Sequence, residues 1–218
     1  GSPICVVMRN ADTRSSDYED FVRVPRPGHA DFSSRYKYGG FSDPRGSGHF
    51  SGRVTAGLVA AGAIAKKAIA KKAITARATG TVRFDTKVLE VGGRRVFDAS
   101  EVEAAAAEAK AAGDSIGGLV EIRVSGLPPG LGEPFFDAAE SLIAHALFAV
   151  PAVRGVEFGD GFAAARMRGS EHNDPFIDSS GKTSKNGAGG INGGITNGNE
   201  LIVRVAVKPA STISAPQK

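Results

Sequence analysis

Residues 51–67 read SGRVTAGLVAAGAIAKK, and this stretch decides the fold that we expect. Its first part is small and apolar nearly all round, which predicts a long helix buried against other elements on several sides. The pattern continues to about residue 76. Lysines 66, 67, 71 and 72 mark a solvated end, where cations suit the helix dipole. A basic stripe for nucleic acid is the alternative reading of these lysines, and we rank it low.

Periodic segments surround this helix on both sides in the sequence. The expected strands cover residues 3–8, 80–91, 117–125, 153–158, 162–168 and 201–207, with a short return strand at Val96-Phe97. A second helix is expected over residues 101–112, with Ser100 as its N-cap and Gly113 as its stop. A third is expected over residues 135–150, and residues 32–50 lack a clear period and are expected to form a structured loop.

Composition excludes several classes of protein and site. The 27 basic and 23 acidic residues leave a net charge of +4, which suits an anionic ligand but is too diffuse to predict nucleic-acid binding. With Cys5 as the single cysteine, a disulfide framework and cysteine-based zinc sites are excluded. Adjacent polar residues at 171–174 lack the fixed geometry of a metal site, so we expect no metal. No apolar span or signal peptide is apparent, so we expect a cytoplasmic protein without a membrane partner.

The hexapeptide Arg26-Pro27-Gly28-His29-Ala30-Asp31 is the first candidate site. Pro and Gly together favour a fixed turn, so His29 is expected on a rigid loop, where catalytic groups are often found. Read alone, a loop histidine is more often solvated or structural than catalytic.

A second candidate lies near the C-terminus. The glycine-rich residues 189–198 match no dinucleotide or phosphate-loop fingerprint. Such a turn can bring backbone N–H groups against a phosphate, and Lys208 with Ser211 and Thr212 adds a charge and two hydroxyls. A tight hairpin followed by an ordinary strand exit explains the same residues, and spacing alone does not separate the two readings.

Five motifs, taken in order, resemble the chorismate synthase family. They are the hexapeptide at 26–31, Gly48-His49-Phe50-Ser51-Gly52-Arg53-Val54-Thr55 running into residues 61–67, residues 126–134, residues 188–195, and Lys208-Pro209 followed by Ser211. Together they cover nearly the entire chain.

The resemblance implies a fold and a reaction. The fold is an α+β, β-α-β sandwich with helices packed between antiparallel sheets, assembled as a homotetramer. The reaction converts 5-enolpyruvylshikimate 3-phosphate to chorismate and phosphate by a 1,4-anti elimination in the shikimate pathway. It requires reduced FMN although the net reaction is redox-neutral. Whether NADPH serves as the reductant or an external reductase supplies the electrons stays open.

The resemblance also implies roles for individual residues. His29 matches a histidine that acts as general acid toward the reduced flavin. Arg26 and Arg53 match arginines that bind the phosphate and carboxylates of the substrate. The residues that match FMN contacts are His49, Phe50, Ser51, Pro151, Ala152, Asn192, Gly193, Lys208, Pro209, Ala210, Ser211 and Thr212. Many members of the family carry arginine where this chain has His49, which puts the charge at that position in doubt.

Two motifs of the family are absent from the 218 residues: an N-terminal Gly-Glu-Ser-His-Gly with its second catalytic histidine, and a C-terminal Arg-x-Asp-Pro. We therefore expect a single domain over residues 1–218, cut at both ends and unable to turn over by itself. The alternative is a non-catalytic FMN- or phosphate-binding module, or an assembly core, derived from that enzyme.

Overall fold

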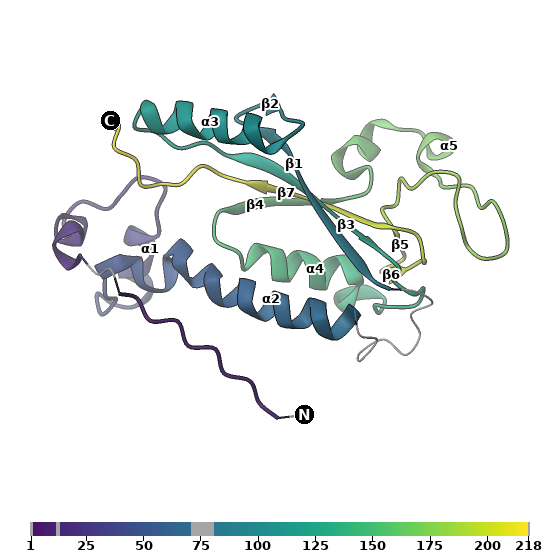
Figure 1. The fold of residues 1–218 in the computed structure, drawn as a ribbon, viewed down its shortest axis with the longest axis horizontal. Helices are drawn as coiled ribbons and strands as arrows, with labels where there is room; N and C mark the ends of the chain where they lie inside the picture. Colours follow the sequence, from purple (N-terminus) through teal and green to yellow (C-terminus); the bar gives the residue numbers. More distant parts are fainter. Residues whose placement is uncertain (1, 12–13, 71–80, 218) are drawn as a thin grey trace.

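The computed structural model describes residues 2–11, 14–70 and 81–217, and it places one antiparallel sheet at the centre of the chain (Figure 1). The sheet has five strands in the order β2-β1-β3-β7-β4, and β5 and β6 form a separate hairpin. The strands are β1 (Arg83–Val91), β2 (Arg94–Arg95), β3 (Gly118–Ser125), β4 (Val153–Phe158), β5 (Ile191–Asn192), β6 (Ile195–Thr196) and β7 (Leu201–Val207).

Two α-helices precede the first strand, and the others lie in connections between strands. The α-helices are α1 (Asp31–Lys37), α2 (Thr55–Ala70), α3 (Ala99–Ala111), α4 (Ala139–Phe148) and α5 (Gly169–His172). The 3₁₀ turns are η1 (Ser15–Tyr18), η2 (Asp20–Val22), η3 (Arg45–Phe50), η4 (Gly52–Val54), η5 (Phe135–Asp137) and η6 (Gly161–Arg166). Within the described part of the chain, none of the helices has the length and apolarity to span a membrane.

The two faces of the sheet differ in chemistry because side chains alternate along each strand. One face is apolar: Val203 and Val205 of β7 lie in the main core with Val124 of β3, and Ile143 and Leu147 of α4 pack against them. The other face carries a row of alternating charge, in which Lys87, Glu121, Arg204 and Glu157 are register partners on β1, β3, β7 and β4. The apolar face therefore holds α4, and the charged face carries ion pairs.

A smaller apolar cluster lies beneath α3. Val91 and Val96 pack with Ala105 of α3 at the β1–β2 end of the sheet. Asp98 caps α3, since its side chain accepts a hydrogen bond from the Glu101 amide. Gly113 follows the helix with a φ of 69°, which matches the expected stop.

The α+β class and most of the expected strands are confirmed. The strands expected at 153–158 and 201–207 are observed with those bounds, and those expected at 117–125 and 80–91 begin one and three residues later. The structure also has an antiparallel sheet with helices against it, as the family resemblance implies.

Five local expectations are wrong. Residues 3–8 form no strand and are exposed, and residues 162–168 fall mostly in the 3₁₀ turn η6. The expected loop at 32–50 begins with helix α1. The return strand is β2, which ends at Arg95, directly before Val96. The cap of α3 is Asp98, two residues before Ser100, because its carboxylate accepts a hydrogen bond from the Glu101 amide.

The helix that decided the expected fold is present, but its burial is one-sided. Its far end touches the main core through Ile69, whereas Leu58 and Val59 are exposed, Val59 by 71%. The α4 helix likewise buries Ile143 and Leu147 and exposes Leu142. Figure 1 shows α2 and α4 on the same side of the sheet, with α4 nearer to it. The expected extension of α2 to residue 76 lies outside the described residues.

Candidate functional site

Segments far apart in the sequence meet at one cavity of about 510 Å³. They are the hexapeptide loop, the turns η3 and η4, the residues just before β4, and the segment that follows β7. The residues expected from the sequence that line this cavity are Arg26, His29, Ser51, Arg53, Pro151, Ala152, Lys208, Ala210, Ser211 and Thr212. Pro209 lies between two of them.

Hydrogen bonds join the hexapeptide loop to the segment after β7. Lys208 Nζ donates to Ser211 Oγ at 2.7 Å, and Ser211 Oγ donates to the Gly28 carbonyl at 2.8 Å. Gly28 has a φ of 68°, a conformation in which glycine is the least strained residue. The segment after β7 is itself anchored, because the Lys208 amide donates to the Ala152 carbonyl at 2.9 Å. The sheet therefore positions the loop that carries His29.

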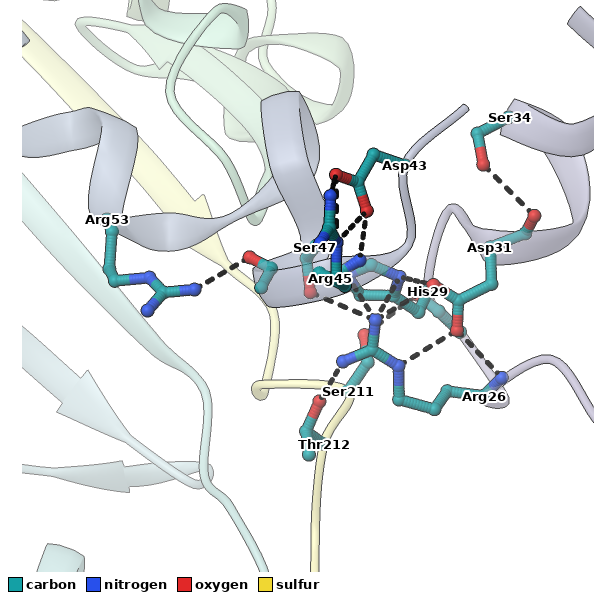
Figure 2. Close-up of polar contacts among 12 residues, drawn as sticks. Arg26, His29, Asp31, Ser34, Asp43, Arg45, Ser47, Arg53, Ser211 and Thr212 are labelled. Carbon is teal, nitrogen blue, oxygen red and sulfur yellow. Dashed lines mark hydrogen bonds and ion pairs between the residues drawn. The ribbon is translucent and has the colours of Figure 1, made fainter. Parts of the chain in front are cut away.

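Arg26 lines the cavity, and its guanidinium is surrounded by polar partners (Figure 2). Its Nη1 donates to Thr212 Oγ1 at 3.0 Å and its Nη2 donates to Ser47 Oγ at 2.9 Å. The guanidinium also lies 4.4 Å from the centroid of the Phe21 ring, which is a cation–π distance. These contacts fix an almost fully buried arginine whose side chain is 8% exposed.

Asp31 joins Arg26 to His29. The carboxylate accepts from Arg26 Nε and Nη2, both at 2.8 Å, and Asp31 Oδ1 lies 2.6 Å from His29 Nδ1. Burial alone would raise the pKa of Asp31, but hydrogen bonds from Arg26 and the nearby charges of His29 and Arg26 lower it to about 2. Asp31 is therefore a carboxylate at neutral pH.

Arg53 presents a second guanidinium to the same cavity. It is held by Ser51, whose Oγ accepts from Arg53 Nε at 3.1 Å, and by the Gly46 carbonyl, which accepts from Nη2 at 2.7 Å. Both contacts are exposed, so this arginine is held more loosely than Arg26. Together with Lys208, the cavity presents three cationic side chains beside the hydroxyls of Ser51, Ser211 and Thr212, which suits phosphate and carboxylate groups.

Two residues of the cavity wall have backbone conformations that are uncommon outside glycine. Ser47 has a φ of 63° and Ala152 a φ of 74°. Such conformations cost about 1–3 kcal/mol each and persist where the surrounding structure enforces them, often at functional sites. Here Ser47 is fixed by Arg26, and Ala152 by the Lys208 amide.

Some expected site residues lie elsewhere. His49 and Phe50 line a neighbouring cavity of about 560 Å³, which shares Phe21 and Ser47 with the first. Asn192 and Gly193 lie in the β5–β6 hairpin before the start of β7, whereas Lys208 follows its end. Seven residues of strand span about 23 Å, so this chain does not bring the hairpin to the cavity. The hairpin itself matches the tight-hairpin reading of residues 189–198.

Several residues that build the site carry little or no signal in the sequence. Asp31 is the exception, because its place in the hexapeptide, two positions from His29, indicates that the two side chains can meet. Ser47, Tyr18 and Phe21 were not recognised, because their proximity to Arg26 depends on tertiary packing and no spacing indicates it.

The cavity passes two tests of fit for a flavin mononucleotide. Its volume lies in the range of about 300–1,000 Å³ that is typical of small-molecule sites. Its donors are cations and hydroxyls, with Lys208, Ser211 and Thr212 grouped as a phosphate requires.

Comparison with known proteins gives a consistent result. A family model described as chorismate synthase matches residues 1–218. A chorismate synthase from Chitinophaga pinensis is 55% identical over 217 residues, covering 100% of this chain and 61% of that protein. Those from Korarchaeum cryptofilum and Thermococcus kodakarensis are 46% and 45% identical, each covering 100% of this chain and 65% of the relative.

A solved structure described as a crystal structure of chorismate synthase is similar in three dimensions as well. It superposes with a TM-score of 0.70 and 30% sequence identity over 81% of this chain and 62% of that one. The chain thus spans about 61–65% of the length of the curated relatives named above. The family model, the relatives and the fold agree: this chain belongs to the chorismate synthase family.

Proposed function

We propose that this chain carries the flavin- and substrate-binding centre of a chorismate synthase. The reaction is the 1,4-anti elimination that converts 5-enolpyruvylshikimate 3-phosphate to chorismate and phosphate. A C–O bond to phosphate and a C–H bond break while a new carbon–carbon double bond forms, so the overall reaction is redox-neutral. One observation carries the proposal: His29, two arginines and the Lys208–Ser211 pair line the same cavity although they come from distant parts of the sequence.

Each group has a role that its chemistry supports. His29 holds and exchanges a proton, since imidazole changes protonation near neutral pH. Arg26 and Arg53 bind the anionic groups of the substrate, and planar guanidinium groups suit carboxylate and phosphate oxygens. Lys208, Ser211 and Thr212 hold the phosphate of FMN, with Ser51, Pro151 and Ala152 beside them. Bound in its reduced form, FMN supplies the electron-rich partner that the family's reaction requires.

Three parts of the proposal reach beyond this cavity. His49 and Phe50, in the neighbouring cavity, and Asn192 and Gly193, in the hairpin, would contact FMN only through further parts of an assembly or a rearrangement. NADPH is the reductant if the enzyme reduces its own flavin. A homotetramer is the expected assembly, and the exposed apolar residues Leu58, Val59 and Leu142 on α2 and α4 support an assembly partner.

The test is a titration of the purified chain with oxidised FMN, followed by flavin absorbance, with and without 5-enolpyruvylshikimate 3-phosphate. Lys208→Met removes a cation from the cavity and should weaken FMN binding at least tenfold. The matched control is Lys182→Met, because Lys182 lies outside the cavity and the loss of its charge should leave binding unchanged. Equal affinities of both variants and the wild type would contradict the proposed site.

Turnover is measured separately. The histidine of Gly-Glu-Ser-His-Gly and the aspartate of Arg-x-Asp-Pro are not among the 218 residues, so we expect this chain to bind FMN without forming chorismate. Chorismate formation by the chain alone would contradict that expectation, and the absence of FMN binding would leave only an assembly role.

A further inference from the structure

The hydrogen bonds around Asp31 determine which nitrogen of His29 carries a proton. The carboxylate has four contacts: Arg26 Nε and the Arg26 amide at Oδ2, at 2.8 and 3.0 Å, and Arg26 Nη2 and His29 Nδ1 at Oδ1, at 2.8 and 2.6 Å. A carboxylate without a proton only accepts hydrogen bonds. A contact of 2.6 Å between Oδ1 and Nδ1 therefore requires a proton on Nδ1.

Arg26 does not compete for that nitrogen. Its Nη2 lies 3.1 Å from His29 Nδ1 and 3.5 Å from Nε2, and both distances are longer than those from Nη2 to Asp31 and Ser47. The two hydrogens of Nη2 already have acceptors, namely Asp31 Oδ1 at 2.8 Å and Ser47 Oγ at 2.9 Å. The lone pair of a neutral His29 is therefore on Nε2. Among the described residues, the long approach of Arg26 is the only contact that Nε2 makes.

We propose that Asp31 is the positioning residue of this site: it holds His29 in the Nδ1–H tautomer, so that Nε2 alone exchanges a proton with a ligand in the cavity. The same carboxylate fixes the guanidinium of Arg26, so a proton donor and an anion-binding group are aligned by a single side chain. The inference rests on the proposed function of His29 as a proton-exchanging residue. Asp31 acts through its two neighbours.

The environment of Asp31 suits this task. Its side chain is 10% exposed and that of His29 is 14% exposed, so water competes little for the bond between them. The low pKa of Asp31 keeps the acceptor charged at the pH values at which histidine titrates. Arg26 and Asp31 contact His29, and the charged groups that line the same cavity are Asp17, Arg53 and Lys208.

A second Asp–His pair in the chain provides a matched control. His172 Nδ1 lies 3.0 Å from Asp160 Oδ2, but this pair is more exposed, at 37% and 28%, and lies outside the cavity. Removing Asp160 should change the tautomer of His172 without affecting His29.

The experiment is nitrogen NMR of the imidazole rings in the chain labelled with ¹⁵N-histidine, at alkaline pH where the rings are neutral. In the wild type, His29 should show a protonated Nδ1 and an unprotonated Nε2. Asp31→Ala should shift His29 to a mixture dominated by Nε2–H, Asp31→Glu should restore Nδ1–H at least in part, and Asp160→Ala should leave the His29 signals unchanged. Circular dichroism verifies that each variant is folded.

Two results would overturn the inference. One is an Nε2–H tautomer of His29 in the wild type. This measurement needs no variant, so it tests the inference even if Asp31→Ala does not fold. The other is a folded Asp31→Ala variant whose His29 keeps Nδ1–H. Failure of the proposed function has a different signature: FMN would not bind to the wild type although His29 has the expected tautomer.

Discussion

Two networks of arginine and carboxylate groups occupy different places in this molecule and differ in what they leave unpaired. On the charged face of the sheet, Arg204 donates to Glu121 at 2.8 Å and to Glu157 at 3.2 Å, between neighbouring strands. At the cavity, Arg26 donates to Asp31, Ser47 and Thr212, which all lie outside the sheet.

The sheet network pairs arginines with carboxylates on neighbouring strands. Strand register places opposite charges side by side, and Arg123 adds bonds to Glu121 and Glu200 at 2.7 and 2.9 Å. Both networks border a cavity, of about 810 Å³ at the charged face and about 510 Å³ beside the hexapeptide loop. The second cavity is the one that also contains a histidine, His29, and a second loop arginine, Arg53. The difference indicates that the first network stabilises the fold, whereas the second stabilises a binding site and leaves donors for a ligand.

The largest expected effect comes from breaking the cavity network at its centre. Arg26→Ala leaves the buried carboxylate of Asp31 without its main partner and should lower the free energy of unfolding by roughly 3 kcal/mol, measured by urea denaturation. The control is Arg45→Ala, because the Arg45–Asp43 pair is highly exposed and its loss should change the free energy of unfolding much less. A loss of similar size in both variants would show that the buried Arg26–Asp31 pair contributes no more than an exposed one.

The matching change on the sheet separates stability from binding. Glu121→Gln weakens two arginine bonds to a side chain that is 9% exposed, and we expect a loss of about 2 kcal/mol in the free energy of unfolding. FMN affinity should stay within about twofold of the wild type, because Glu121 lies on the charged face of the sheet and outside the cavity. A tenfold drop in FMN affinity for a folded Glu121→Gln variant would remove the distinction between the two networks.

Acid should weaken the cavity network through Asp31. Its folded-state pKa of about 2 lies below the usual value of about 3.9, so between these values the unfolded chain binds more protons. Stability therefore falls as the pH decreases from about 4 to about 2, by roughly 2 kcal/mol from this residue. The test compares the free energy of unfolding of the wild type and of Asp31→Asn as a function of pH. The same decrease between about pH 4 and pH 2 in both proteins would contradict this prediction.

The smallest effect comes from two glycines with similar backbone. Gly28→Ala and Gly93→Ala each place a side chain at a positive φ, 68° and 78°, and each should cost about 1 kcal/mol of stability. Of the two, only Gly28 lies against the segment that follows β7, where a Cβ would contact Ser211. We therefore expect weaker FMN binding for Gly28→Ala alone, and equal binding by both variants would argue against the role of that loop.

Much of the sheet could be predicted from the sequence because its signals are local. The strands at 153–158 and 201–207 are bounded by turn residues, and their apolar side chains are read directly from the sequence. Residues 162–168 and 3–8 have similar composition but form no strand, since pairing partners are decided by tertiary structure. The exposure of Val59 on α2 was likewise unpredictable, because composition indicates that a helix can be buried and does not identify what covers it.

The candidate site can likewise be divided into residues that local sequence motifs predict and residues that depend on tertiary packing. Motifs predict His29, Arg26 and Lys208. The hydrogen bond that Ser47 accepts from Arg26 instead depends on a turn in which Ser47 has a positive φ, and no sequence pattern predicts that turn. The placement of Asn192 away from the cavity follows from strand length, once the order of the strands is known.

The central claim is that FMN binds in the cavity beside His29. The most direct test adds FMN to the ¹⁵N-histidine-labelled chain and follows all four histidines by NMR. The account predicts that the signals of His29 shift in proportion to bound FMN while those of His172, which lies outside the cavity, do not. Saturation of the chain with FMN without any change at His29 would contradict it.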